Sequence, residues 1–585
     1  MFSPTVAADN SQPTQSVAIS RQHAMISPLS NTYTNRPQRE ITMQGGQAIA
    51  QILKSEGIQH VFCFPFTPIL EALSDAGIRP IVARQERVAE NMADGFSRAS
   101  NGQQLGVVTV QQAAGAENAF AGIAHAWTDS SPLLFLPGHP GRDLLGVPPT
   151  FDAINSFRAV TKWSDWVPSA DAIEQRMRRA FTLLRSGRPG PVMLEIPADI
   201  AQHSLSHSLN YQPVTPVISS GDPDAIQDAV RLLRGAERPM IWAGQGVLYA
   251  GGTPALTTLA EQLAAPVMTT LLGKSAFNET HPLSLGTGAY ACTDMVRDYL
   301  RHSDAILAIG ASLSKTIFAP DLPAGKRIVH ATVDPRDLNK DYQADVSILG
   351  DARLILEQLV AEVHSQGPTD TGQQQRVREH VAQVRAPWKQ RWQPKLTADE
   401  VPINPYRVIG ELIRATDPEK TIVTHDSGNP RDQLLPIYES VVPRGYLGWG
   451  HSTQLGFSLG VSMGAKLAQP EKLVVHFLGD AAFGMVGMDI ETAVREEIPI
   501  LTMLLNNSAM GNYEKNIPIS CERFGTKNLS GNYAEVARGL GAHAERVEAP
   551  QEIAAAIQRG INATHEGRPA VLEFITREEP DMAIG

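Results

Sequence analysis

From residue 43 onward, short apolar runs of strand length alternate with longer segments whose apolar residues recur at helical spacing. Early in the chain, His60–Phe64 is typical of a strand, Arg87–Ser100 of a helix and Gly106–Val110 of a buried strand. This alternation is typical of parallel sheets covered by helices. The same pattern predicts helices over Gln47–Glu56 and Pro68–Asp75, and strands over Arg79–Ala83, Val192–Ile196, Pro239–Trp242, Ala305–Ile309, Arg327–Ala331, Lys420–Thr424, Leu473–Leu478 and Pro499–Leu505.

Polar segments divide this pattern into three α/β blocks. The first forty residues are rich in Ser, Thr, Asn, Gln and Pro and lack apolar periodicity, so we expect a flexible tail there. The fold class predicted for the rest is three doubly wound parallel-sheet domains. The predicted division is a tail at 1–40, a first domain at 41–205, a linker at 206–222, a central domain at 223–364, a connector at 365–400 and a third domain at 401–585.

Composition narrows the function classes. The formal net charge is −11, from 50 Lys and Arg against 61 Asp and Glu, and no basic stripe is present, which excludes a nucleic-acid partner. Cys63, Cys292 and Cys521 are far apart and form no CxxC pair, which argues against a thiolate zinc site or a disulfide framework. No apolar run approaches the roughly 20 residues of a membrane span. We expect a cytoplasmic protein, with organellar targeting by residues 1–40 left open.

The most informative loops follow two consecutive predicted strands. Gly479-Asp480-Ala481-Ala482-Phe483-Gly484 follows the first, a helix is expected over Met488–Arg495, and Asn506-Asn507 ends the second. The carboxyl ends of such strands face the crevice where open α/β sheets bind ligands. Asp480, Asn507 and the carbonyl of Ala509 could supply three oxygens to Mg²⁺, with a diphosphate and water completing the octahedron. We expect a helix N-terminus after Phe483 to favour negative charge. The alternative is an ordinary turn and a strand-end cap.

The pattern as a whole resembles the thiamine diphosphate binding motif, in which a Gly-Asp pair precedes a double Asn. Ala481 departs from the motif, which usually has Gly there. Arg84-Gln85-Glu86 with Asn91–Arg98 resembles the stretch of acetolactate synthase-like enzymes that carries their cofactor-activating glutamate. That resemblance implies that Glu86 bonds N1′ of the aminopyrimidine and supports proton transfer. The local sequence alone favours a helix N-terminal residue instead.

Further matches in the same order extend this resemblance over about Met43–Phe574. It implies a pyrimidine-binding, a central and a diphosphate-binding domain, with thiamine diphosphate and Mg²⁺ held between two subunits of a homodimer or homotetramer. Asp480, Asn507 and Ala509 would hold the metal. By this resemblance the cofactor-binding residues are Glu86, Ser427, Gly428, Asn429, Thr453, Leu455, Gly479, Asp480, Ala481, Ala482, Asn507, Ala509, Met510 and Gly511.

Central domains of this family bind FAD or ADP, or no nucleotide. Here Gly310–Ser314 lacks the Arg that often marks such a nucleotide, so the sequence gives FAD or ADP no support.

The substrate side departs from acetolactate synthase. After the double Asn that enzyme has two apolar residues and a Gln-Trp pair, whereas this chain has Gly511-Asn512-Tyr513-Glu514-Lys515-Asn516. We therefore expect little or no acetolactate from pyruvate. Glu514 is the expected catalytic group for proton transfer after the first attack, ahead of Tyr513 and of His139, which is more typical of a turn.

Two chemistries fit these residues. The first is decarboxylation of a 2-oxo acid and carboligation to a second carbonyl such as an aldehyde. The alternative is a 2-hydroxyacyl-CoA lyase or oxalyl-CoA decarboxylase acting on an acyl-CoA. A non-catalytic nucleotide-binding paralog is disfavoured because Glu86, Asp480 and Asn507 are all intact.

Overall fold

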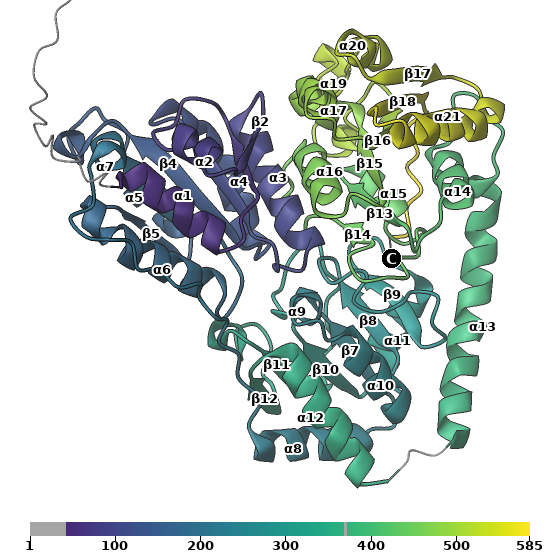
Figure 1. Cartoon of the computed structure of the whole chain (residues 1–585). Helices are drawn as coiled ribbons and strands as arrows, with labels where there is room; N and C mark the ends of the chain where they lie inside the picture. Colours follow the sequence, from purple (N-terminus) through teal and green to yellow (C-terminus); the bar gives the residue numbers. More distant parts are fainter. Residues whose placement is uncertain (1–42, 368–370, 585) are drawn as a thin grey trace, which may run out of the picture. The chain divides into compact units, whose positions relative to one another are not determined.

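The computed structural model describes residues 43–367 and 371–584, so the tail predicted at 1–40 lies outside the described residues. The described chain contains three six-stranded sheets in which every pair of neighbouring strands is parallel (Figure 1). Helices lie between most successive strands of each sheet, as is usual for parallel connections, whereas loops without an α-helix join β8 to β9, β10 to β11 and β11 to β12. The predicted fold class is therefore confirmed.

The first sheet has the strand order β2-β1-β3-β4-β6-β5. Its strands are β1 His60–Cys63, β2 Arg79–Val82, β3 Gly106–Val110, β4 Leu133–His139, β5 Trp163–Trp166 and β6 Val192–Pro197. Its helices are α1 Gly45–Ser55, α2 Leu70–Asp75, α3 Glu86–Ala99, α4 Ala114–Thr128, α5 Ala153–Phe157, α6 Ile173–Leu184 and α7 Ala198–Gln202.

The central sheet has the order β12-β11-β10-β7-β8-β9. Its strands are β7 Pro239–Ala243, β8 Val267–Thr270, β9 Ser284–Gly288, β10 Ala305–Ile309, β11 Arg327–Thr332 and β12 Val346–Leu349. Its helices are α8 Pro223–Arg234, α9 Gln245–Tyr249, α10 Thr253–Leu263, α11 Asp294–His302 and α12 Ala352–Ser365. The long helix α13, Thr371–Leu396, then leads from this block to the third (Figure 1).

The third sheet has the order β14-β13-β15-β16-β18-β17. Its strands are β13 Thr421–His425, β14 Tyr446–Leu447, β15 Leu473–Gly479, β16 Leu501–Asn506, β17 His543–Val547 and β18 Ala570–Ile575. Its helices are α14 Pro405–Ala415, α15 Asn429–Leu434, α16 Phe457–Ala468, α17 Asp480–Val486, α18 Ile490–Arg495, α19 Pro518–Phe524, α20 Tyr533–Gly539 and α21 Ile553–His565.

All predicted strands are present; β3 and β10 have the predicted bounds, and each of the others has at least one end shifted by one or two residues. One local prediction is wrong: the helix expected to begin after Phe483 begins at Asp480, with Gly479 as its N-cap. No loop separates β15 from this helix, because Gly479, the last residue of the strand, has the extended backbone of an N-cap. Within residues 43–367 and 371–584, no helix is both long enough and apolar enough to cross a membrane.

Helix α3 of the first block packs directly on α16 of the third. A side chain at Gly464 would collide with the carbonyl of Met92, and one at Gly95 would collide with the carbonyl of Val461. The two helix backbones therefore touch at positions where only glycine fits. This contact fixes the two blocks against each other along the helices that lead into the candidate site.

Candidate active site

A cavity of about 240 Å³ opens at the carboxyl ends of β13, β15 and β16. Loops that follow neighbouring parallel strands meet at this edge, where α/β sheets bind ligands. Thirteen of the fourteen predicted cofactor-binding residues line it, although they come from four separate segments. They are Ser427, Gly428, Asn429, Thr453, Leu455, Gly479, Asp480, Ala481, Ala482, Asn507, Ala509, Met510 and Gly511.

The carboxylate of Asp480 is buried and only half satisfied. Its Oδ1 accepts a hydrogen bond from the backbone N–H of Ala481 at 2.8 Å, whereas Oδ2 has no partner among the described residues. Burial raises the pKa of Asp480 to about 6. A buried carboxylate oxygen without a partner is costly, so this atom fits a bound cation.

The other predicted metal ligands lie beside Asp480 in the same cavity. The side-chain oxygen of Asn507 accepts the N–H of Ala509 at 3.1 Å, which fixes the amide at the end of β16. These are the hard oxygen donors that suit Mg²⁺. No cluster of three His, Cys, Asp or Glu capable of holding a metal occurs in the described ranges, so a metal here would rely on amide, backbone and ligand oxygens as well.

Two loops close over this cavity. The amide of Asn512 donates to the side-chain oxygen of Asn429 at 2.9 Å. A side chain at Gly511 would meet the Asn429 amide, so the glycine leaves room for this amide. Gly428 has φ +89°, a conformation that also favours glycine. Asn429 therefore joins the turn after β13 to the loop after β16.

Sequence reasoning missed several lining residues, of which Arg577 is the most polar. Arg577 follows β18, and its guanidinium pairs with Glu400 at 2.8 Å and with Glu579 at 2.7 Å. Arg577 lies just after the end of β18. Because the sequence analysis did not predict β18, a search of the predicted strand ends could not find Arg577. The other missed lining residues are Pro405, Pro430, Gln433, Leu505, Thr576 and Glu579.

The proton-transfer candidates lie at different distances from the cavity. Tyr513 lines it, whereas Glu514 does not and instead pairs with the ammonium of Lys527, which also pairs with Glu578 at 2.9 Å. His139 is buried at the end of β4, where burial lowers its pKa and its Nδ1 accepts the N–H of Gly141 at 3.3 Å. The role of Glu514 stays a prediction.

Glu86 is the first residue of α3 and is buried against α4. The amide of Asn118 donates to Glu86 Oε2 at 3.2 Å, and a side chain at Gly115 would lie 3.6 Å from Oε1. In the described part of the chain, every residue that lines the 240 Å³ cavity falls within 405–579. A single chain therefore does not bring Glu86 into this cavity.

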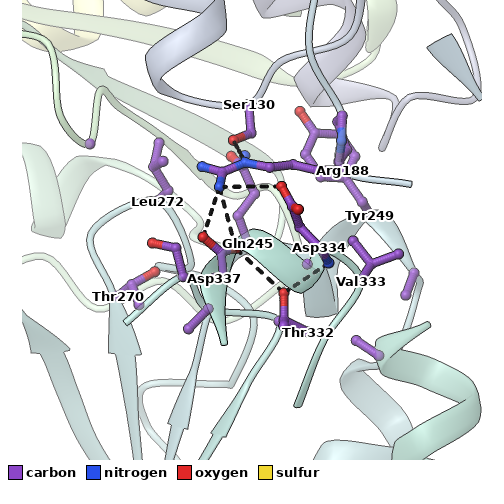
Figure 2. A pocket seen from close by; sticks show the side chains of 18 of the residues that line it. Ser130, Arg188, Gln245, Tyr249, Thr270, Leu272, Thr332, Val333, Asp334 and Asp337 are labelled. Carbon is purple, nitrogen blue, oxygen red and sulfur yellow. Dashed lines mark hydrogen bonds and ion pairs between the residues drawn. The ribbon is translucent and has the colours of Figure 1, made fainter. Parts of the chain in front are cut away.

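A larger cavity of about 720 Å³ is lined by residues of all three blocks, including Gly310–Ser314. Figure 2 shows the part of its lining around Arg188, Asp334 and Asp337. One wall carries an ion-pair network in which Arg188 lies 3.1 Å from Asp337 and 3.9 Å from Asp334. The same guanidinium donates to the hydroxyl of Ser130 at 2.8 Å. The network ties the carboxyl end of β11 to the segment before β6.

Three family models match successive parts of the chain. The N-terminal TPP binding domain of thiamine pyrophosphate (thiamine diphosphate) enzymes matches residues 43–161, their central domain matches 226–359, and their C-terminal TPP binding domain matches 426–574. Each model covers one of the three sheets over most of its strands.

Curated relatives match over most of their length. The chain is 30% identical over 548 residues to a probable acetolactate synthase large subunit of Methanocaldococcus jannaschii, covering 89% of this chain and 90% of that protein. It is 31% identical over 488 residues to the acetolactate synthase isozyme 3 large subunit of Escherichia coli, covering 80% and 83%. Together with the three domain models, these matches confirm the family resemblance: the chain belongs to the acetolactate synthase-like family of thiamine pyrophosphate enzymes.

Proposed function

We propose that this thiamine diphosphate-dependent enzyme uses Mg²⁺ and decarboxylates a 2-oxo acid, transferring the remaining unit to a second carbonyl. The observation that supports this most is the convergence of thirteen predicted cofactor-binding residues on one cavity at the carboxyl edge of the third sheet. The relatives named acetolactate synthase support the 2-oxo acid branch over acyl-CoA chemistry.

The residues of this chain would divide the work by position. Asp480, Asn507 and the carbonyl of Ala509 would hold Mg²⁺ against the diphosphate, because all three residues line the cavity and Oδ2 of Asp480 is buried without a partner among the described residues. Thiamine diphosphate, when bound, supplies a nucleophilic carbon and an electron sink. Glu86 would accept and return the proton at N1′ of the aminopyrimidine, a task that suits a carboxylate buried beside an amide donor.

We infer that a second copy of the chain completes the site, in a homodimer or homotetramer. The cavity of about 240 Å³ lies below the roughly 300–1,000 Å³ of ordinary ligand sites. Its described lining also lacks Glu86, the residue expected to act on the cofactor. A first domain from a partner chain would supply both the missing wall and the missing carboxylate.

Mixing two inactive variants tests this arrangement. Glu86→Gln and Asp480→Ala should each be inactive, and a heterodimer of the two would hold one intact site and one doubly altered site. Random reassociation of equal amounts should therefore restore about a quarter of the parent activity. If the site lay within one chain, mixing would restore nothing.

The reaction itself is tested by product analysis. The parent, loaded with thiamine diphosphate and Mg²⁺, should release CO₂ from at least one member of a panel of 2-oxo acids. Addition of an aldehyde or a second 2-oxo acid should give a carboligation product, and Glu86→Gln should give neither. Turnover of oxalyl-CoA or a 2-hydroxyacyl-CoA, with none on any 2-oxo acid, would favour the alternative chemistry.

We also propose that the larger cavity receives FAD or ADP. Its volume of about 720 Å³ lies in the range of nucleotide-sized ligands, and it opens at the carboxyl ends of β10 and β11, the usual crevice of an open α/β sheet. Flavin fluorescence in the supernatant of the heat-denatured protein would identify FAD. Calorimetric titration of the flavin-free protein with ADP would identify the shorter ligand, and a negative result in both would exclude this proposal.

A further inference from the structure

Asp129 is a buried carboxylate of the first block that holds the backbone of the third. It caps the carboxyl end of α4, and its side chain is fully buried. The N–H of Gly450 donates to its Oδ2 at 2.9 Å, and the N–H of His451 donates to its Oδ1 at 3.0 Å. Both oxygens therefore bind consecutive peptide groups of a segment more than 300 residues away in the chain.

Arg98 and His125 of the first block lie against this carboxylate. Arg98 Nη2 lies 3.4 Å from Asp129 Oδ2, and His125 Nε2 lies 3.2 Å from it. Burial opposes ionisation, but His125 and Arg98 together lower the pKa of Asp129 below its usual range. Arg98 is itself fixed by Asp94 at 2.5 Å and donates to the carbonyl of Gly448 at 2.8 Å. Asp129 thus accepts two charge-assisted hydrogen bonds from the segment while Arg98 and His125 hold its side chain in place.

The other end of the same segment is held by a second buried carboxylate. Asp426 follows β13, and its two oxygens accept the N–H groups of Gly456 and Ser458, each at 3.0 Å. Next to Gly456, the ring of Phe457 stacks on His125 with centroids 3.9 Å apart. The segment Gly450–Gly456 is therefore fixed at both ends by carboxylates that the proposed chemistry does not use.

Between these two anchors, the segment reaches both cavities. Gly450 and His451 line the larger one, whereas Thr453 and Leu455 line the smaller one. Neither anchor lines the smaller cavity, so each can act on a bound cofactor only through the backbone that it holds.

We propose that Asp129, together with Asp426, is a positioning residue that sets the placement of Thr453 and Leu455, of which the family resemblance implies that the first faces the 4′-amino group of the cofactor and the second lies under its bent form. This rests on the proposed function, because it assumes that thiamine diphosphate occupies the 240 Å³ cavity. The diphosphate end would be held separately, by Asp480 and Asn507 from the loops after β15 and β16. Loosening the segment should therefore reduce the reactivity of the cofactor much more than its affinity.

Asp129→Asn tests this in the full-length protein. The amide keeps one acceptor oxygen, so one of the two N–H groups loses its partner and the charge is lost. We expect hydrogen–deuterium exchange at C2 of bound thiamine diphosphate, measured by NMR, to slow about 10- to 100-fold, as small misplacements at reacting atoms do. The dissociation constant of thiamine diphosphate at saturating Mg²⁺ should stay within about threefold, since the diphosphate contacts are unchanged.

Glu279→Gln is the matched control. Glu279 is also a buried carboxylate between two blocks, accepting the N–H of Ser440 at 2.7 Å and the ammonium of Lys274 at 2.5 Å. In the described part of the chain, Glu279 makes no hydrogen bond or ion pair with Gly450–Gly456, so its loss should lower the thermal midpoint without slowing C2 exchange. If Asp129→Asn does not fold, Asp426→Asn carries the test with the same two expectations.

Three outcomes would overturn the inference. Unchanged exchange in folded Asp129→Asn would show that the segment needs no such anchor. Equal slowing in Glu279→Gln would show that general loosening, and not this contact, is responsible. A parent protein that binds no thiamine diphosphate or does not accelerate C2 exchange would refute the proposed function itself, and the inference with it.

Discussion

The amide of Asn118 donates a hydrogen bond to Oε2 of Glu86 across 3.2 Å, which ties the first turn of α3 to α4. The contact holds the carboxylate in one orientation and leaves Oε1 facing Gly115. A carboxylate held by an amide on one oxygen keeps the other free to exchange a proton.

Glu86→Gln should therefore retain thiamine diphosphate but lose catalysis. General acid–base steps contribute about 10²–10⁴ in rate, so C2 exchange and turnover should fall by that range. Glu71→Gln, on the exposed face of α2, is the control and should behave as the parent. Normal exchange in Glu86→Gln, followed by NMR, would refute the assignment.

Replacing the expected metal ligands should weaken two affinities together. Asp480→Ala and Asn507→Ala each remove an oxygen from the cavity, and a cation that bridges protein and diphosphate couples both ligands reciprocally. We expect each dissociation constant to rise by about 5- to 150-fold, measured by titration of Mg²⁺ and of thiamine diphosphate. Asn562→Ala, an exposed substitution on α21, should change neither. Cofactor binding by the parent that is independent of Mg²⁺ would contradict this prediction.

Glu195 on β6 should make the protein less stable as the pH rises. Burial, reinforced by the negative charge of Asp152, raises the pKa of Glu195 to about 8 from 4.5. Between these values the folded state binds a proton that the unfolded state releases, so this contribution to stability is lost as the pH rises through the folded pKa. Each pKa unit corresponds to about 1.4 kcal/mol, so the effect should exceed about 1 kcal/mol.

Glu195→Gln should remove this dependence. The midpoint of thermal unfolding of the variant should exceed that of the parent at about pH 8.5 and the difference should shrink towards about pH 5. A difference that does not change with pH would show that Glu195 is already ionised in the folded protein.

Gly464→Ala should destabilise the contact between α3 and α16. The added methyl group meets the carbonyl of Met92, and overpacking of this kind costs about 1–3 kcal/mol. Gly539→Ala in α20, where a new side chain has nothing within 4 Å, should leave the thermal midpoint unchanged or raise it slightly. Equal midpoints for the two variants would show that the helices can move apart freely.

The loop after β16 should determine the substrate. We expect little acetolactate from pyruvate alone, because Gly511-Asn512-Tyr513-Glu514-Lys515-Asn516 lacks the tryptophan of the Gln-Trp pair that acetolactate synthase has there. Glu514→Gln should slow turnover on the true substrate without changing cofactor affinity, whereas Glu522→Gln on nearby α19 should not. Robust acetolactate formation, unaffected by Glu514→Gln, would show that this interpretation of the loop is wrong.

Sequence patterns predicted most interior strands, with β4, β8 and β18 missed, but among the edge strands they predicted only β2. β3 and β10 were placed at their observed bounds because every residue in them is buried, which gives a continuous apolar run. β5 and β17 were missed because both are edge strands with polar, partly exposed residues. Arg577 was missed together with β18, because a site residue at the end of a strand can be predicted only once the strand itself has been predicted.

The anchors of the 450–456 segment could not be predicted at all. Asp129 and Gly450 meet where α4 packs against the start of α16. No local sequence pattern around either residue indicates a partner so distant in the chain. Asp480 and Asn507 were accessible because each follows a recognisable strand, so that topology alone brings them together.

The bare glycine contact between α3 and α16 has a consequence for protein engineering. Because backbone meets backbone at Gly95 and Gly464, no side chain at these two positions can adapt to a new neighbour. A chimera that exchanges only the first or only the third block with a relative would join surfaces that have not been matched. Productive crossover points should therefore keep α3 and α16 from the same parent, and shuffling is best confined to the central block.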